Sequence, residues 1–289
     1  MGKNTVNALE VIIIVDNMVH SSGLFAEWGF SALLKVIVGE KTYNILFDTS
    51  TTDTILLHNM EVLGIKPGEI DYIVLSHGHY DHTGGLKIFL EKAGKKIVIA
   101  HPDAFKKKYS LKNGFLRYIG SPFSLEEIRS LSNLMLVRSS FMFVPGVYYM
   151  GEIAREGFPE HREDMYMLEE GVLVEDPMLD DTGVAVNVEG LGLVVITGCG
   201  HSGVLNIVRH AEKTFGEKVY AVIGGLHMYG MEPDKVYKIF DRLEEWGVKR
   251  VAPAHCSGIV AKCQASEIKR GFLLETGSGA RIIFKGEKE

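Results

Sequence analysis

The stretch SHGHYDHTGG, residues 76–85, places three histidines and one aspartate between His77 and His82. An apolar run typical of a buried strand, residues 70–75 (IDYIVL), comes directly before it, and two glycines close it. Imidazole nitrogens and carboxylate oxygens are ligands that Zn²⁺ and similar divalent ions accept readily. A solvated polar loop is the alternative, but the HxHxDH order directly after a strand favours a metal site.

The spacing of the motif indicates more than one ion. Alternate residues of an extended segment point to the same side, so His77 and His79 can bind one ion together. Asp81 and His82 are adjacent and diverge, which suits a second ion beside the first. We therefore expect two divalent metal ions. Zinc is the first choice, with manganese or iron as alternatives that accept the same ligands.

The composition of the chain is that of an ordinary globular protein. Its 289 residues are 46% hydrophobic with a formal net charge of -6, which argues against nucleic-acid binding as the main task. No apolar run reaches the roughly eighteen residues of a membrane span, so no membrane partner is expected. The N-terminus lacks a signal-peptide pattern, so we expect a cytoplasmic protein. Three cysteines, an odd number, argue against a disulfide framework.

An apolar strand followed by a Gly/His loop recurs along the chain. The loops begin at residues 76, 198, 224 and 253. The predicted strands are residues 9–15, a hairpin over 31–48, 70–75, 96–100, 183–189, 193–197, 219–223 and 248–252; the predicted helices are 54–63, 85–93, 204–215 and 233–246. Residues 105–171 differ. They read as an insertion or cap on a single domain spanning 1–289, with a capping-box helix start at Ser124 and Glu127.

The HxHxDH motif resembles the signature of the metallo-β-lactamase superfamily, and the resemblance covers nearly all of the chain outside residues 105–171. It implies an α/β fold of the αββα type, with two mixed sheets flanked by helices and a binuclear metal site. The family pattern includes an aspartate at the end of an early strand, matched here by Asp48 in LFDTS. Asp48 would orient a ligand histidine or the attacking hydroxide.

Three later strand-end motifs complete the expected site. In GCGHSG (198–203), Cys199 stands where relatives often carry a bridging aspartate, so we expect His201 as a ligand and keep Cys199 as an alternative ligand or an inert buried thiol. In PAHCSG (253–258), His255 is the expected last ligand, with a core histidine as the alternative. In GGLH (224–227), His227 is a ligand, a support for one, or, as we expect, a substrate or proton-transfer contact.

These assignments give a full candidate site. The expected metal ligands are His77, His79 and His201 for one ion, and Asp81, His82 and His255 for the other. The expected catalytic residues are Asp81, Asp48 and His227. In the cap, basic side chains would hold a phosphate and tyrosines would stack on a flat ring, with a solvated face and core packing as the alternatives. The candidates are Lys106, Lys107, Lys108, Arg117, Arg155, Arg162, Tyr148 and Tyr149.

Three functions are compatible with these residues. The leading one is a hydrolase in which the metal ions activate water against a phosphoester or a lactone-type ester. The motifs also resemble those of the branch that contains the archaeal dihydropterin-aminobenzene ribofuranosyl phosphate synthase, which implies a transfer reaction in pterin biosynthesis. Cys199 in place of a bridging aspartate favours the third, a metal-containing sensor without turnover. The expected partner is a small, phosphorylated molecule; no oligomeric state is predicted.

Overall fold

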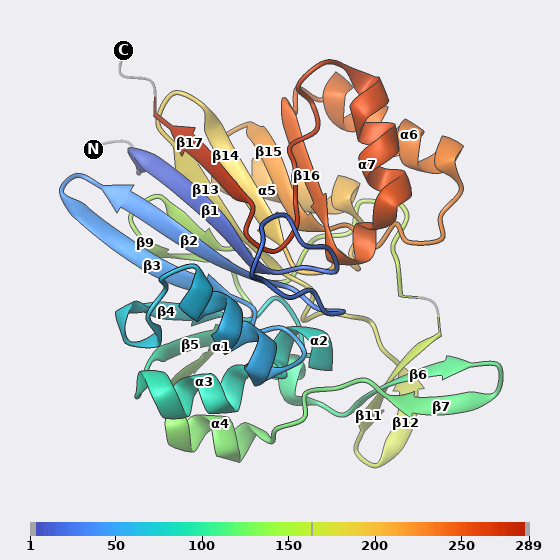
Figure 1. Cartoon of the computed structure of the whole chain (residues 1–289). Coiled ribbons are helices and arrows are strands. Elements are labelled where there is room, and N and C mark those ends of the chain that lie inside the picture. Colours follow the sequence, from blue (N-terminus) through green and yellow to red (C-terminus); the bar gives the residue numbers. More distant parts are fainter. Residues whose placement is uncertain (1–3, 163, 287–289) are drawn as a thin grey trace.

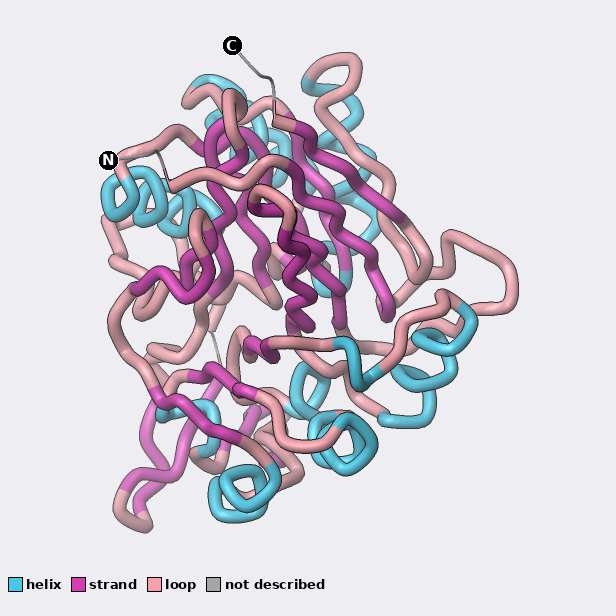
Figure 2. Tube along the Cα trace, turned by 90° about the vertical axis from the view of Figure 1, so that its left-hand side faces the viewer, coloured by secondary structure: helices cyan, strands magenta, loops and turns pink. Residues whose placement is uncertain are grey.

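Two mixed β-sheets pack face to face in the computed structural model, which describes residues 4–162 and 164–286 (Figures 1 and 2). The first sheet holds, in spatial order, β17 (Arg281–Lys285), β1 (Ala8–Val15), β2 (Ser31–Val38), β3 (Lys41–Phe47), β4 (Tyr72–Val74), β5 (Ile97–Ala100) and β8 (Asn133–Leu136). The second holds β16 (Arg250–Ala254), β15 (Val219–Gly225), β14 (Gly192–Thr197), β13 (Gly183–Val188), β10 (Val147–Tyr149) and β9 (Phe141–Val144).

Strand alternation explains how both faces of each sheet become buried. On β1, Val11 and Ile13 point into the core between the sheets, whereas Ile12 and Ile14 contact the helices outside. The first sheet is covered by α1 (Asp53–Val62), α3 (Leu86–Ala93) and α4 (Leu125–Leu131), and the second by α5 (Val204–Phe215), α6 (Pro233–Glu245) and α7 (Gly258–Ile268). This arrangement is the expected αββα sandwich.

The local signals of the sequence correspond to observed elements. The 31–48 run forms the β2–β3 hairpin around Gly39 and Glu40. The capping box of α4 is present, because Ser124 Oγ accepts a hydrogen bond from the Glu127 N–H and the Glu127 carboxylate accepts one from the Ser124 N–H. The helix α7 and the strand β17 were not expected from the sequence. No helix among the described residues is long and apolar enough to cross a membrane.

The stretch 105–171 is not one cap. Its middle part, with α4, β8, β9 and β10, belongs to the main sandwich. Two hairpins, one near its start and one that continues past its end, form a separate four-stranded sheet, ordered β12 (Val172–Glu175), β11 (Met165–Glu169), β6 (Lys108–Lys112) and β7 (Phe115–Tyr118). This small sheet projects from one end of the sandwich, as Figure 1 shows at the lower right. The pairing of β6 with β11 joins segments some fifty residues apart, which local patterns do not reveal.

Short helices connect several of these strands to the loops that follow them. They are α2 (Tyr80–Thr83), η1 (Pro67–Glu69), η2 (Pro102–Phe105) and η3 (His255–Ser257). Two of them, α2 and η3, contain residues of the expected metal site. The site therefore lies where strands end and short helices begin.

Candidate metal centre

All the expected ligands follow strands that end at the same edge of the sandwich. β3 and β4 are parallel neighbours in one sheet, and β14, β15 and β16 are parallel neighbours in the other. The carboxyl ends of parallel strands meet at one edge, so the loops after them converge. The loop residues in question are Asp48 after β3, His77–His82 after β4, Cys199 and His201 after β14, His227 after β15 and His255 after β16.

Three of these strand-end residues have unusual backbone conformations. The φ angles of Asp48, His227 and His255 are 58°, 49° and 48°. A residue with a side chain at positive φ costs on the order of 1–3 kcal/mol, and such strain collects at functional sites. The left-handed turn directs each side chain back toward the shared edge of the sheets.

The first group of donor atoms comes from His77, His79 and His201. Their ligand nitrogens all lie within 4.8 Å of one another, and His77 Nε2 is 3.0 Å from His79 Nδ1. Burial lowers the pKa of His79 to about 3 and holds the pKa values of His77 and His201 well below the ordinary value. These imidazoles are therefore neutral at pH 7, which is the form that binds a metal ion.

The second group comes from Asp81, His82 and His255. Asp81 Oδ2 is 3.4 Å from His255 Nε2, and His82 Nε2 is 3.3 Å from the same atom. Ligand atoms around a tetrahedral zinc with Zn–N bonds of 2.0–2.1 Å lie roughly 3.3 Å apart, so these distances suit a common ion. Burial lowers the pKa of His82, but the carboxylates of Asp48 and Asp81 outweigh it and raise that pKa to about 9.

The hydrogen-bonding state of the histidines supports metal binding. Among the described residues, His201 Nε2 is buried without a hydrogen-bond partner. Leaving a buried polar atom unsatisfied costs about 1–3 kcal/mol, and a bound cation would remove that cost. The Nδ1–H of His201 donates to the carbonyl of His161 at 2.6 Å, which leaves the Nε2 lone pair free. The donor set therefore fits a divalent ion.

Asp48 holds His82 in the orientation that a ligand needs. The Nδ1–H of His82 donates to Asp48 Oδ2 at 2.7 Å, so loss of the other ring proton to a bound metal ion would free the Nε2 lone pair that faces the second group. Asp48 itself accepts hydrogen bonds from the N–H and the hydroxyl of Ser76, both at 2.7 Å. A Cβ at Gly198 would lie 1.9 Å from Ser76 Oγ, so GCGHSG requires glycine at this position. The geometry agrees with the expected orienting role of Asp48.

Cys199 lies between the two groups of donor atoms. Its Sγ is 3.3 Å from His82 Nε2, and it forms candidate metal groups with His77 and His82, with His201 and His227, and with His255 and Cys256. Burial raises the pKa of the thiol well above its ordinary value, whereas a bound cation favours the thiolate. The central position favours ligation over an inert thiol.

Substitution of Cys199 by serine is expected to change the spectrum of the cobalt-loaded protein. Loading with Co²⁺ should give a thiolate-to-cobalt charge-transfer band in the near ultraviolet, and Cys199→Ser should abolish it because the sulfur donor is gone. Cys263→Ser removes an exposed cysteine and serves as the control. An unchanged band in Cys199→Ser, lost instead in Cys256→Ser, would assign the thiolate to Cys256.

A short segment with three aspartates, residues 176–181, hydrogen-bonds the loops that carry the candidate metal ligands. Asp180 Oδ2 accepts from the Gly78 N–H at 2.8 Å, and Asp181 accepts from the N–H groups of His201 and Ser202. The ammonium of Lys108 on β6 is fully buried between Asp176 Oδ2 at 2.6 Å and Asp180 Oδ1 at 2.8 Å. Lys108 is therefore a structural cation. The expectation that it binds phosphate is wrong.

A cavity of about 500 Å³ separates the metal centre from the small sheet. The metal-centre residues that line it include His79, Asp81, Cys199, His201, His227 and His255, and the opposite wall includes Tyr80, Lys112, Phe115 and Arg117. Arg117 Nη2 donates to Tyr80 Oη at 3.1 Å. Of the expected substrate contacts, Arg117 is thus placed on the cavity.

The other expected substrate contacts lie elsewhere. Tyr149 is completely buried in the core between the sheets, so its ring cannot stack on a ligand, and this expectation is wrong. Lys106 forms ion pairs with Asp103 and Glu169. Lys107 is exposed and does not line the cavity. Core packing explains Tyr149, because strand β10 lies inside the second sheet.

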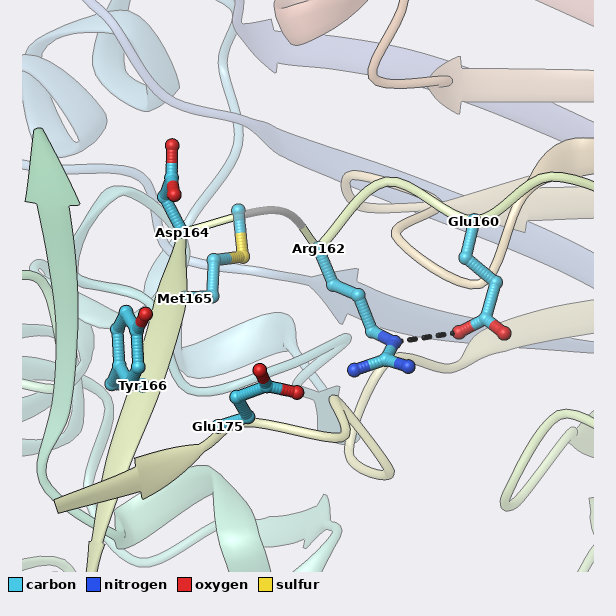
Figure 3. Close-up of a pocket in the computed structure, with 6 residues that line it drawn as sticks. All are labelled: Glu160, Arg162, Asp164, Met165, Tyr166 and Glu175. Carbon is cyan, nitrogen blue, oxygen red and sulfur yellow. Dashed lines mark hydrogen bonds and ion pairs between the residues drawn. The ribbon is translucent and has the colours of Figure 1, made fainter.

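A separate hollow of about 450 Å³ lies at the start of β11, next to the first cavity (Figure 3). It is lined by Glu160, Arg162, Asp164, Met165, Tyr166 and Glu175. Arg162 is paired with Glu160 at 3.0 Å, and Arg155 also contacts Glu160, at 2.9 Å. Both arginines, expected as phosphate contacts, thus have a carboxylate partner already.

Sequence reasoning missed the residues that support His255. Asp16 and Asn17 follow β1: Asp16 Oδ1 accepts from the His255 N–H at 2.6 Å, and Asn17 Oδ1 accepts from His255 Nδ1–H at 3.0 Å. The ring of Trp28 lies 5.3 Å from that of His255. An Asp-Asn pair directly after the apolar run 9–15 was the available signal, because it ends a strand as Asp48 does.

Similarity to known proteins identifies the family of this chain. The family model described as "Metallo-beta-lactamase superfamily" matches residues 35–214. The 7,8-dihydropterin-6-methyl-4-(beta-D-ribofuranosyl)-aminobenzene-5'-phosphate synthase of Methanocaldococcus jannaschii is 34% identical over 84% of this chain and 85% of its own. An uncharacterized protein of the same archaeon is 33% identical over 89% of this chain and 93% of its own.

A solved structure indicates the same family. A metal-dependent hydrolase of the beta-lactamase superfamily is 28% identical, with a TM-score of 0.82, over 96% of this chain and 99% of that one. The sandwich, the converging strand-end ligands and these relatives agree. The chain belongs to the metallo-β-lactamase superfamily.

Proposed function

We propose that this protein is a metal-dependent enzyme that transfers a (dihydropterin-6-yl)methyl group from its diphosphate ester to an arylamine. The observation that carries the proposal is the 34% identity to the synthase over most of both chains. The cavity chemistry supports it, because aromatic side chains (Trp28, Tyr80 and Phe115) and basic ones (Lys112 and Arg117) face the metal centre together. Flat rings stack on aromatic side chains, and phosphate oxygens pair with guanidinium and ammonium groups.

Each group of candidate residues would have its own role in this reaction. His77, His79 and His201 would hold one divalent ion and Asp81, His82 and His255 the other, with Cys199 between them. When bound, the ions supply Lewis acidity toward the oxygens of the diphosphate. Arg117 and Lys112 would bind the same phosphates and orient them. Asp48 would keep His82 in its ligand tautomer.

The bond changes balance without a redox partner. The C–O bond between the pterin methyl carbon and the diphosphate breaks, and its electron pair leaves with the diphosphate. A carbon or nitrogen of the arylamine forms the new bond and releases one proton. His227 lies on the cavity, and its buried Nδ1 has no hydrogen-bond partner among the described residues. We assign to it the role of accepting that proton.

Hydrolysis is the second candidate, and the 28% identical structure of a metal-dependent hydrolase favours it. The same metal and phosphate contacts would then act while water replaces the arylamine. The products would be the pterin alcohol and diphosphate, so the two reactions differ in their need for the acceptor.

A test with and without acceptor separates these reactions. The zinc-loaded protein is incubated with the dihydropterin that carries diphosphate on its 6-methyl group, and the release of diphosphate is measured. Transfer predicts release that depends on added ribofuranosyl-aminobenzene phosphate, with the coupled product detected by mass spectrometry. Release at the same rate without acceptor would support hydrolysis instead. Stoichiometric metal with no release in either case would contradict both and favour a sensor. Asp81→Asn is the inactive control.

A further inference from the structure

A second cavity of about 260 Å³ lies directly beside the metal centre. It shares two side chains, Trp28 and His255, with the larger cavity, so the two are neighbours across this pair. Its lining residues are Asp16, Asn17, Met18, Trp28, Tyr229, Ala254, His255, Gly258, Ile259 and Lys262. The proposed function uses the larger cavity for the pterin diphosphate and leaves this one without an occupant.

The wall of the second cavity is aromatic and apolar. The rings of Trp28 and Tyr229 meet edge to face at 5.9 Å, and Trp28 also lies 5.3 Å from the ring of His255. Tyr229 is 73% exposed, Ile259 60% and Trp28 46%. Large apolar side chains gathered on the surface around a hollow mark a binding site more often than scattered ones do.

Two polar groups of this cavity can still form an ion pair or a hydrogen bond with a ligand. Lys262 Nζ contacts the Thr276 carbonyl at 3.3 Å and Met18 Sδ at 3.6 Å, and the ion pairs found among the described residues do not include it. Asp16 uses Oδ1 for the N–H groups of Asn17 and His255, while its buried Oδ2 has no hydrogen-bond partner in the described part of the chain. An anion would pair with Lys262, and a hydroxyl group of a ligand would supply a donor to Asp16.

We propose that this second cavity is the binding site for the arylamine acceptor, an inference that rests on the proposed transfer reaction. The aromatic ring lies against Trp28 and Tyr229 with its amino group toward the larger cavity, a sugar hydroxyl donates to Asp16, and the phosphate tail pairs with Lys262. A dry cavity of about 150 Å³ already holds benzene, so 260 Å³ suits one ring with a short extension. The shared His255 places the ring beside the metal centre, where the acceptor must meet the pterin methyl carbon.

Tryptophan fluorescence tests this site without turnover. The chain has two tryptophans, and Trp246 lies against Phe158 and Arg209, away from the cavity residues. In a Trp246→Phe background, Trp28 is the remaining fluorophore. Titration of the zinc-loaded protein with ribofuranosyl-aminobenzene phosphate is expected to quench it with a saturating curve.

Variants then locate the ligand. In this background, Lys262→Gln should weaken binding about tenfold, because a hydrogen bond to a charged group is lost. Ile259→Glu, at the exposed rim, should weaken it as well by repelling the phosphate. Lys238→Gln, an exposed lysine on α6, is the matched control and should bind as the parent does. Arg117→Gln in the larger cavity should leave acceptor binding unchanged.

The outcomes separate this inference from the proposed function. Absence of quenching, or binding weakened by Arg117→Gln but not by Lys262→Gln or Ile259→Glu, would overturn the acceptor site. If coupled product forms while the KM for the acceptor is unchanged in Lys262→Gln and Ile259→Glu, the transfer reaction stands and the site is wrong. If quenching follows the expected variants but no coupled product forms, the ring site stands and the transfer reaction fails.

Discussion

Replacement of His79 by alanine is expected to weaken zinc binding by more than about a hundredfold and to abolish turnover. Loss of a group that merely supports a metal ligand already costs roughly 10–100-fold in affinity or activity, and loss of a ligand costs more. His79 Nδ1 lies 3.0 Å from His77 Nε2 in the first ligand group, so removal of this ring deletes one of its three donors. Zinc content after dialysis and competition with a chromophoric chelator measure the change.

A histidine remote from the metal centre provides the control. His58 on α1 hydrogen-bonds the Gly23 carbonyl, and His58→Ala should keep parent metal content and activity. If His79→Ala retains both metal equivalents and full turnover, the assignment of the first ligand group is wrong. If it keeps metal but loses turnover, His79 acts on the substrate instead.

Replacement of Lys108 by methionine is expected to lower the free energy of unfolding by about 3–5 kcal/mol, because it leaves buried carboxylates without their cation. Burial alone would lower the pKa of Lys108, but Asp180 and Asp176 raise it, so the ammonium stays charged at neutral pH. Asp180 also fixes the Gly78 N–H between two ligand histidines. The variant should therefore bind zinc more weakly, by about 10–100-fold.

The neighbouring lysine is the matched control. Lys107 is exposed, and Lys107→Met should change stability by no more than about 0.5 kcal/mol. Urea unfolding of the metal-free proteins measures stability apart from metal binding. Adding Asp176→Asn to Lys108→Met should recover part of the lost stability, since it removes one unpaired charge. Equal stability of Lys108→Met and the parent would contradict the buried ion-pair network.

Much of the fold was predictable because its signals are local. The β-branched run 9–15, the hairpin 31–48 and the capping box at Ser124 each act through neighbours in the chain, and each forms the expected element. The small sheet was not predictable. Its strands are four or five residues long and half exposed, and β6 pairs with β11 across a segment that contains α4 and strands of the main sandwich, so no local periodicity marks it.

The candidate site was likewise predictable only in part. The residue types and spacing of HxHxDH, with the family resemblance of GCGHSG and PAHCSG, indicated the candidate metal ligands, because ligand chemistry and strand alternation are properties of a short segment. Only the tertiary structure decided that Lys108 is a buried counter-ion, that Tyr149 belongs to the core, and that Trp28 separates two cavities. Those facts depend on which distant segments pack together, and no local sequence pattern specifies that packing.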